Sequence, residues 1–246
     1  MIRLFAGETL PDLSINWQST YIESRFLAYG GTAPFAPFYM DDNNSVLSVL
    51  NGHAVLYAEE LDLQVGACFL AMHPDITTVS ASWEIATALA AVLQQPLQTK
   101  KVMQLQSPLS VAVTEAEEQM PRQVYPLLSK VFGDTMPAFE DWYVDVSHRL
   151  RHNNCTLVGV CWEGETVSTA MTVAQSADAV VIGAVATAEK ARKRGYAAQC
   201  IGYLAEKHKE KTVMISPKNV YAEKLYKNMG FVVTDTIGQF TTKKED

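Results

Sequence analysis

The sequence lacks the long apolar runs that mark membrane helices and signal peptides. No apolar stretch approaches the ~20 residues that span a bilayer, and the N-terminal residues MIRLFAGETL contain no apolar signal core. The four cysteines form no C-x-x-C pair, and each stands among apolar residues, as reduced buried thiols do. These absences favour a cytoplasmic protein that does not act at a membrane.

Several motifs of nucleotide, metal and ester chemistry are also missing. The sequence has no G-x-x-x-x-G-K-[ST] loop, no G-x-G-x-x-G fingerprint and no G-x-S-x-G elbow. His148 and His152 are four residues apart with Cys155 close behind, but there is no H-E-x-x-H motif and no clear further ligand. We therefore expect no bound metal and interpret the two histidines as the end of a surface helix.

Basic residues are few. The formal net charge is −7, which argues against a general nucleic-acid binder. Residues 1–105 hold 4 Lys and Arg against 10 Asp and Glu, whereas the remainder is nearly balanced at 16 against 17. The acidic first half favours a cationic partner by long-range attraction.

The pattern of apolar residues predicts two α/β domains, 1–107 and 108–246. In the first half we expect helices over 18–30 and 80–93, and strands over 63–73 and 99–106, with a hairpin at Asn51-Gly52. In the second half we expect strands over 109–116, 179–187, 211–217 and 231–240, and a strand pair over 155–175. Helices are predicted over 120–132, 138–151, 196–208 and 219–229. The similar order of elements predicts an internal duplication, with Gly66-Ala67 corresponding to Gly183-Ala184.

The segment RKRGYAAQ, residues 192–199, lies between a buried strand and a helix start. A helix N-terminus offers unpaired N–H groups and a positive dipole end. Gly195 allows close backbone approach, and Ala197 and Ala198 leave the first turn uncluttered. Three cations at a helix start are unfavourable unless an anion binds there. The segment therefore predicts a site for a multiply charged phosphate group.

Two motifs then carry a family resemblance. Arg192-Lys193-Arg194-Gly195-Tyr196-Ala197 resembles the acetyl-CoA-binding motif of the GNAT N-acetyltransferase superfamily, Arg/Gln-x-x-Gly-x-Gly/Ala. NVYAEKLYKNMGF resembles its second motif, Asn-x-x-Ala-x-x-Leu-Tyr-x-x-x-Gly-Phe, and every position matches: Asn219, Ala222, Leu225, Tyr226, Gly230 and Phe231. The resemblance covers about residues 109–240. Lys193 stands where the family often has glycine, and Glu189 where it often has proline.

The resemblance implies an α/β protein of two GNAT-like domains, each a mixed, mostly antiparallel central sheet flanked by helices. The first domain would be degenerate, because the loop MHPDITTVSAS has no glycine and no cation to hold CoA. The second would be an N-acetyltransferase that uses acetyl-CoA as co-substrate and a small-molecule or peptide amine as acceptor. Loops at 30–45 and 134–142 and the domain junction are candidates for the acceptor pocket, and oligomeric state stays open.

The resemblance also implies roles for individual residues. Backbone N–H groups of Arg192, Lys193, Arg194, Gly195, Tyr196 and Ala197 would hold the pyrophosphate. Val185, Ala186 and Thr187 would pair with the pantetheine arm as an added strand does. Asn219 would contact the pantetheine side, cap its helix, or do both.

Tyr226 occupies the family position of the acid that protonates the leaving thiolate. The alternative is an ordinary core tyrosine on a helix face. No base for the amine is identified, since Glu163, Glu165 and Asp178 lie in turns. A base relayed through water or an amine that arrives deprotonated remains equally compatible. The missing base supports the rival interpretation, an acyl-CoA-binding regulatory module without catalysis.

Overall fold

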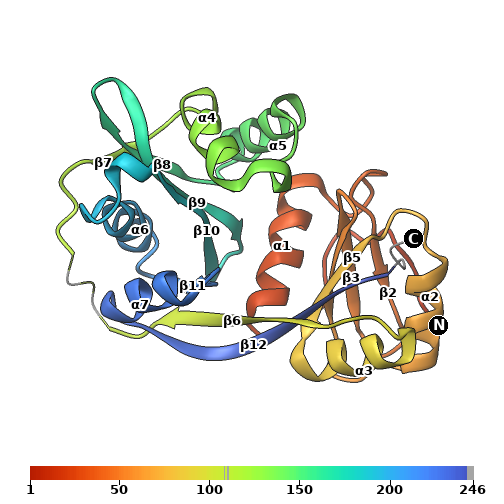
Figure 1. Ribbon diagram of the computed structural model, residues 1–246. Helices are drawn as coiled ribbons and strands as arrows, with labels where there is room; N and C mark the ends of the chain where they lie inside the picture. The colour runs from red at the N-terminus through yellow and green to blue at the C-terminus, as the bar shows by residue number, and fades with distance from the viewer. Residues whose placement is uncertain (108, 110, 243–246) are drawn as a thin grey trace. The chain divides into compact units, whose positions relative to one another are not determined.

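The computed structural model describes residues 1–107, 109 and 111–242, and the chain forms two compact units (Figure 1). Met1–Val102 and the segment starting at Thr234 form the first unit, and Met103–Val233 form the second. The sequence places a single boundary between residues 107 and 108. Pro108 lies outside the described residues, and the units instead divide at Val102 and again at Val233.

The first unit is a mixed sheet with the strand order β1-β2-β3-β4-β5-β12, in which β12 is the last strand of the chain, Phe231–Thr241. Its pairs are antiparallel except for the parallel β4 and β5. Asn51 and Gly52 both have positive φ, 49° and 77°, which is the turn geometry predicted for the β3–β4 hairpin. The elements are β1 (Arg3–Phe5), α1 (Trp17–Tyr29), β2 (Phe38–Met40), β3 (Val46–Leu50), β4 (His53–Tyr57), α2 (Leu63–Met72), β5 (Thr78–Ser82), α3 (Trp83–Leu93) and β6 (Gln98–Leu105).

The strand predicted over 63–73 is wrong, because this segment is helix α2. The side chain of Asp62 caps the helix by accepting hydrogen bonds from the N–H groups of Gln64 and Val65, each at 3.1 Å. Val65 is the segment's only β-branched residue, and a short apolar run alone does not separate strand from helix. Parallel neighbours such as β4 and β5 also need a long crossover, which is usually a helix.

The second unit has the strand order β6-β11-β10-β9-β8-β7, with only β10 and β11 parallel. The strand predicted over 109–116 is wrong, because β7 begins at Ala116; Ser110 lies outside the described residues. The elements are β7 (Ala116–Glu118), α4 (Pro121–Phe132), η1 (Gly133–Thr135), α5 (Phe139–Arg151), β8 (Leu157–Trp162), β9 (Glu165–Gln175), β10 (Ala179–Thr187), η2 (Glu189–Ala191), α6 (Tyr196–Lys207), β11 (Thr212–Ile215), α7 (Val220–Asn228) and β12 (Phe231–Thr241).

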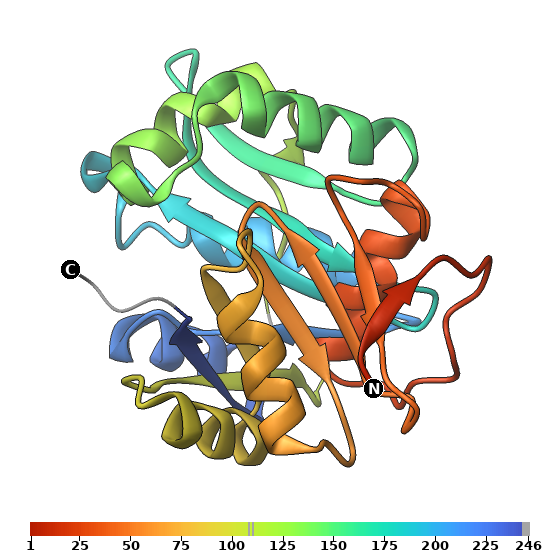
Figure 2. The same ribbon diagram turned by 90° about the vertical axis from the view of Figure 1, so that its right-hand side faces the viewer.

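Helices cover both faces of the second sheet (Figures 1 and 2). Side chains alternate along β8, so that Val158 and Val160 pack in the core with α6 and α7, while Leu157 packs in the core with α4 and α5. On the α2 and α3 face of the first unit, Leu47 and Val49 of β3 join a core completed by Phe240 of β12. Both units are therefore mixed, mostly antiparallel sheets flanked by helices, as predicted.

Strands β6 and β12 each contribute to both units. Met103 and Gln104 at the end of β6 pair with Ile215 and Met214 of β11 in the second unit. Residues 237–241 of β12 pair with residues 78–82 of β5 in the first unit. The strand that follows α3, the last helix of the first unit, therefore also pairs in the second unit. The strand that follows α7, the last helix of the second unit, likewise pairs in the first unit. This exchange explains why a single sequence boundary does not describe the units.

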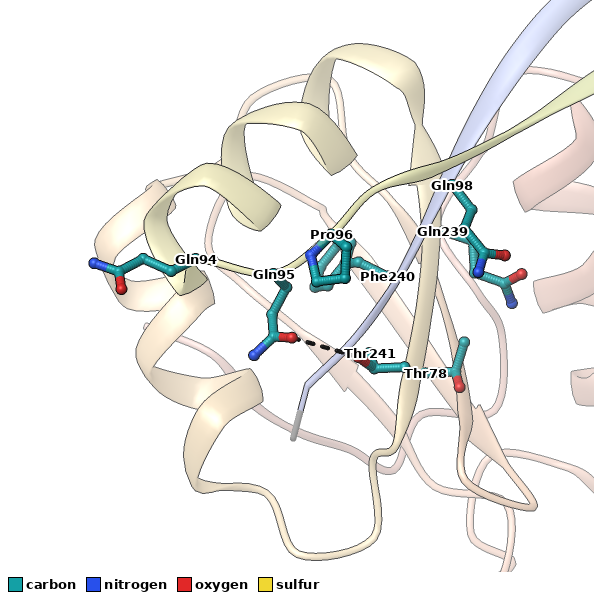
Figure 3. Close-up of a pocket in the computed structure, with 8 residues that line it drawn as sticks. All are labelled: Thr78, Gln94, Gln95, Pro96, Gln98, Gln239, Phe240 and Thr241. Carbon is teal, nitrogen blue, oxygen red and sulfur yellow. Dashed lines mark hydrogen bonds between the residues drawn. The ribbon is translucent and has the colours of Figure 1, made fainter. Parts of the chain in front are cut away.

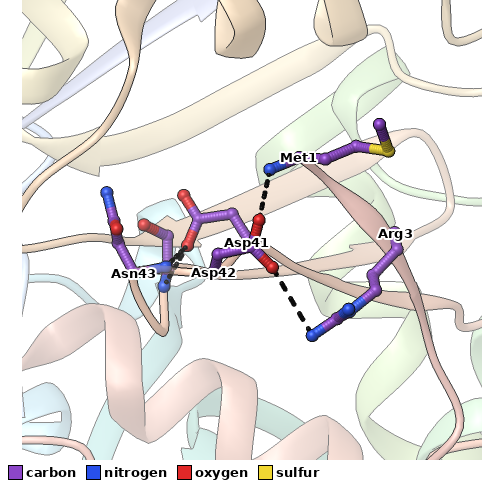
Figure 4. A network of polar contacts seen from close by, with 6 residues as sticks. Met1, Arg3, Asp41, Asp42 and Asn43 are labelled. Atoms are coloured by element: carbon purple, nitrogen blue, oxygen red, sulfur yellow. Dashed lines mark hydrogen bonds and ion pairs between the residues drawn. The ribbon is translucent and has the colours of Figure 1, made fainter.

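Polar contacts hold the first strand and the turn after β2 (Figure 4). The N-terminal amino group of Met1 is 2.8 Å from Asp42 Oδ2, and Arg3 Nη2 is 3.6 Å from Asp42 Oδ1. Asp41 Oδ1 accepts hydrogen bonds from the N–H groups of Asn43 and Ser45, both at 2.9 Å. Asp41 therefore closes the turn, and Asp42 anchors β1.

The cysteines differ in exposure, contrary to the expectation that all four are buried. Cys155 and Cys200 are buried, and burial raises the pKa of the Cys200 thiol to about 12. Cys68 on α2 and Cys161 on β8 are exposed. The error for Cys68 follows from the misassigned strand, because an exposed helix face replaces a buried strand.

Candidate functional site

Strand β10 has an open edge near its end. It pairs with β11 only through residues 179–182, while β9 continues beside it to Thr187. A β-bulge lies between Gly183 and Ala186, where Ala184 takes a left-handed φ of 49°. Beyond Ile182 the backbone groups on one side of β10 are consequently available to a ligand.

The loop after β10 exposes backbone N–H groups. Lys193 and Gly195 both have positive φ, 62° and 83°, and turns of this kind form anion-binding concavities. Gly195 is the N-cap of α6 and provides no side-chain cap, and the first turn of the helix contains no acidic residue. Ala191 is fully buried in the core and anchors the loop. The φ of Lys193 is left-handed, which glycine adopts without strain. This explains why glycine is common at this position in the family that the sequence resembles.

A cavity of about 740 Å³ lies between this loop, β10 and α7. Val131 of α4 and Tyr221 of α7 also line it, and neither was singled out from the sequence. Nine of the ten residues predicted to bind acetyl-CoA line this one cavity: Val185, Ala186, Thr187, Arg192, Lys193, Gly195, Tyr196, Ala197 and Asn219.

Arg194, the tenth predicted residue, does not line the cavity. Its guanidinium carbon lies 4.5 Å from the centroid of the Trp162 ring at the end of β8. The sequence motifs assign Trp162 no role at this loop. No sequence signal links it to the loop, because the two are brought together by the pairing of β9 with β8 and β10.

Helix α7 begins as predicted. The side-chain oxygen of Asn219 accepts hydrogen bonds from the N–H groups of Tyr221 and Ala222, both at 3.0 Å, and Asn219 also lines the cavity. Tyr226 is 4% exposed and packs with Met229 and Phe231 in the core. Burial raises its pKa to about 12, so the phenol is protonated at neutral pH. It is not among the residues lining the cavity, and its catalytic role stays a prediction.

The cavity lining contains no carboxylate and no imidazole among the described residues. Of the three carboxylates considered from the sequence, Glu165 pairs with Lys190 Nζ at 3.0 Å. That hydrogen bond and charge hold the pKa of Glu165 below its usual range. Glu165 is therefore a solvated, ionised group, and the base for the amine stays unidentified.

The first unit has a hollow of a different kind, with a volume of about 600 Å³ (Figure 3). Glutamine amides and threonine hydroxyls predominate in its lining, which carries no charge, and Gln95 Oε1 accepts a hydrogen bond from Thr241 Oγ1 at 3.4 Å. Neutral amides provide none of the charge that a diphosphate requires. This hollow does not resemble the cavity of the second unit.

Features of metal sites and of membrane helices are absent from the described part of the chain. It contains no cluster of three or more His, Cys, Asp or Glu side chains placed to hold a metal ion. The ring centroids of His148 and His152 lie 4.2 Å apart at the end of α5, with the rings tilted by 33°. Within the same residues, no helix combines the length and the hydropathy that a membrane crossing requires.

Comparisons with known proteins agree with this geometry. Residues 116–231 match the model of the acetyltransferase (GNAT) family. An acetyltransferase from the GNAT family of Colwellia psychrerythraea superimposes with a TM-score of 0.60 at 15% identity, over 99% of this chain and 100% of that one. A GCN5-related N-acetyltransferase from Kribbella flavida gives 0.59 at 15% identity, over 92% and 97%.

A tandem GNAT protein from the clavulanic acid biosynthesis pathway gives a TM-score of 0.56 at 11% identity, over 94% of this chain and 95% of that one. No curated protein matches the sequence significantly. At such identities the structural similarities establish the fold, and the family match lies within the second unit. The chain therefore has the fold of GNAT proteins throughout, and its C-terminal half belongs to the acetyltransferase (GNAT) family.

Proposed function

We propose that the second unit transfers an acetyl group from acetyl-CoA to an amine by direct attack when both substrates are bound. One observation carries this proposal. The open edge of β10 and the uncapped start of α6 line the same cavity. An extended arm and a diphosphate require these two features side by side.

The chain's own groups would bind and orient the co-substrate. N–H groups at the start of α6, with Arg192 and Lys193, would hold the diphosphate. Backbone groups of residues 185–187 would pair with the amides of the pantetheine arm. An N–H of this edge would also donate to the acyl oxygen, where negative charge develops during transfer. Bound acetyl-CoA supplies the activated acyl group.

Tyr226 would stabilise the leaving thiolate. Its pKa of about 12 lies above the ~8.5 of a thiol, so complete proton transfer from the phenol is uphill. The raised pKa keeps the hydroxyl protonated and able to donate a hydrogen bond as the sulfur becomes negative. Tyr226 is therefore assigned to thiolate stabilisation, with the final proton drawn from water.

A second candidate function is an acyl-CoA-binding module without catalysis. It is favoured by the absence of carboxylate and imidazole groups from the cavity lining among the described residues. An amine of pKa ~10 must lose a proton before it attacks, and the described residues that line this cavity supply neither of these usual bases. The enzyme proposal therefore requires water or an amine that arrives unprotonated.

Thiol release from acetyl-CoA over a panel of small amines and peptide amines separates these possibilities. The enzyme proposal expects release that depends on one class of amine and exceeds the rate without acceptor. CoA binding measured by calorimetry, without release on any amine, would support the module. Absence of CoA binding would overturn both.

A further inference from the structure

The side chain of Arg194 is held outside the cavity that its neighbours line. Its guanidinium carbon lies 4.5 Å from the Trp162 ring centroid, within the range of a cation–π contact. Among the described residues, the structure gives this guanidinium no hydrogen bond and no ion pair. Arg194 is therefore a positioned cation whose charge is not neutralised by an acid.

The other cation on the same ring differs. Lys190 Nζ lies 5.9 Å from the Trp162 centroid and pairs with Glu165 at 3.0 Å. Its charge is offset, whereas that of Arg194 is not. An indole restricts the motion of a guanidinium but leaves its charge and its planar set of donors available. Such an arrangement lowers the entropic cost of binding an anion.

Trp162 is itself fixed. It is the last residue of β8, pairs with Glu165 across the β8–β9 turn, and packs against the core beneath α6. Arg194 directly precedes Gly195, which lines the proposed diphosphate site. A phosphate bound by Arg194 would consequently lie about one side chain away from the diphosphate.

We propose that Arg194, held on Trp162, is a separate subsite for the 3′-phosphate on the ribose of CoA. This inference rests on the proposed function, because it takes CoA as the ligand of the cavity. CoA carries one phosphate beyond its diphosphate, separated from it by the ribose. Arginine is suited to this group because its fork of donors matches phosphate oxygens. Trp162 is a positioning residue, since it acts through Arg194.

The test compares the affinities of CoA and dephospho-CoA, which lacks only the 3′-phosphate. Calorimetry on the full chain should show CoA binding about tenfold tighter, as one charge-assisted pair allows. Arg194→Gln should bring this ratio close to one without changing the affinity for dephospho-CoA. Trp162→Phe keeps an aromatic ring with a weaker cation–π contact, and should give a ratio between the two.

Arg122→Gln is the matched control. Its guanidinium lies 5.0 Å from the Tyr143 centroid on α5, and Arg122 does not line the cavity, so both affinities should stay at their wild-type values. Equal ratios in wild type and Arg194→Gln would overturn the inference alone. Equal weakening of both ligands by Arg194→Gln would place Arg194 in the diphosphate site and also overturn it. Failure of wild type to bind either ligand would overturn the proposed function as well.

Discussion

The two units begin their crossover helices with opposite chemistry. Helix α6 follows Arg192, Lys193 and Arg194, starts at a glycine with φ of 83°, and has no side-chain cap. Helix α2, which connects the parallel strands β4 and β5 of the first unit, follows Glu59 and Glu60 and is capped by Asp62. The first unit therefore caps this helix with its own side chain, whereas the second leaves the start of its helix without a side-chain cap. The loop at residues 58–62, which joins β4 to α2, is therefore the counterpart of residues 192–197. The predicted counterpart, MHPDITTVSAS, is not.

The following helices differ as well. Tyr226 is the seventh residue after the Asn219 cap of α7, and Leu89 is the seventh after the Ser82 cap of α3. Both side chains are buried, but only Tyr226 carries a hydroxyl. The same topology thus carries different chemistry in the two units, and the difference lies in a few residues at the helix starts and on one helix face.

The largest expected effect comes from placing an aspartate at the start of α6, as Asp62 stands at the start of α2 in the first unit. Gly195→Asp should weaken CoA binding about 100-fold, because a carboxylate at the start of α6 would repel the diphosphate. A Cβ at Gly195 meets no protein atom within 4 Å, so a clash within the protein does not explain the loss. Gly195→Asn is the uncharged control of the same shape and should retain most of the affinity in calorimetry. Equal losses in both variants would contradict the electrostatic argument.

Removing the hydroxyl that distinguishes α7 from α3 should affect turnover. Tyr226→Phe should lower kcat by about 10²-fold, the lower end of acid–base contributions, with CoA affinity unchanged. Because burial raises the Tyr226 pKa to about 12, the wild-type kcat should show no decline from loss of this proton below pH 10. Steady-state kinetics with calorimetry checks both points. Unchanged kcat in the variant would make Tyr226 a core residue like Leu89.

Removing the cap of the first unit should cost stability without creating a site. Asp62→Ala should lower the free energy of unfolding by about 1 kcal/mol and Tm by ~2–4 °C, because two helix donors lose their acceptor. CoA stoichiometry should stay at one per chain, since Glu59 and Glu60 remain. Asp62→Asn keeps the accepting oxygen and should melt near wild type. A second bound CoA in Asp62→Ala would show that the Asp62 cap alone prevents the first unit from binding CoA.

The smallest effect concerns the bulge in β10, which has no counterpart in β4, where every residue has negative φ. Ala184→Gly should raise stability by ~0.5–1 kcal/mol because glycine adopts a left-handed φ without strain. The neighbouring Gly183→Ala is the opposite control, since its Cβ would meet Val173 Cγ1 at 2.8 Å and should lower Tm. Thermal melts of the two variants check this. Destabilisation by Ala184→Gly would show that Ala184 contributes to stability mainly through the packing of its side chain.

The site was predictable from sequence to the extent that it is local. The loop at 192–197 and the Asn219 cap are set by neighbours in the chain, and the structure places them as expected around one cavity. The contact of Arg194 with Trp162 joins residues 32 positions apart through sheet pairing. Periodicity and motifs contain no information on such pairs, so Trp162 was not recognised.

The fold was predictable wherever turn or cap chemistry reinforced the apolar pattern. Asn51-Gly52 identified its hairpin, whereas 63–73 had an apolar run that either structure accepts, and the decisive Asp62 cap was not weighed. The contributions of β6 and β12 to both units were not predictable, because strand pairing over such separations has no local signal.

The borrowed strand has a consequence for biosynthesis. Ser82 at the end of β5 pairs with Ile237, 155 residues later in the chain. At synthesis rates of ~5–20 residues per second, this partner emerges roughly 8–30 s after β5. During that interval β5 lacks its β12 neighbour, and unpaired strand edges favour association with other chains. The sheet of the first unit is thus completed only after β12 emerges, which makes nascent chains of this protein candidates for chaperone protection until that point.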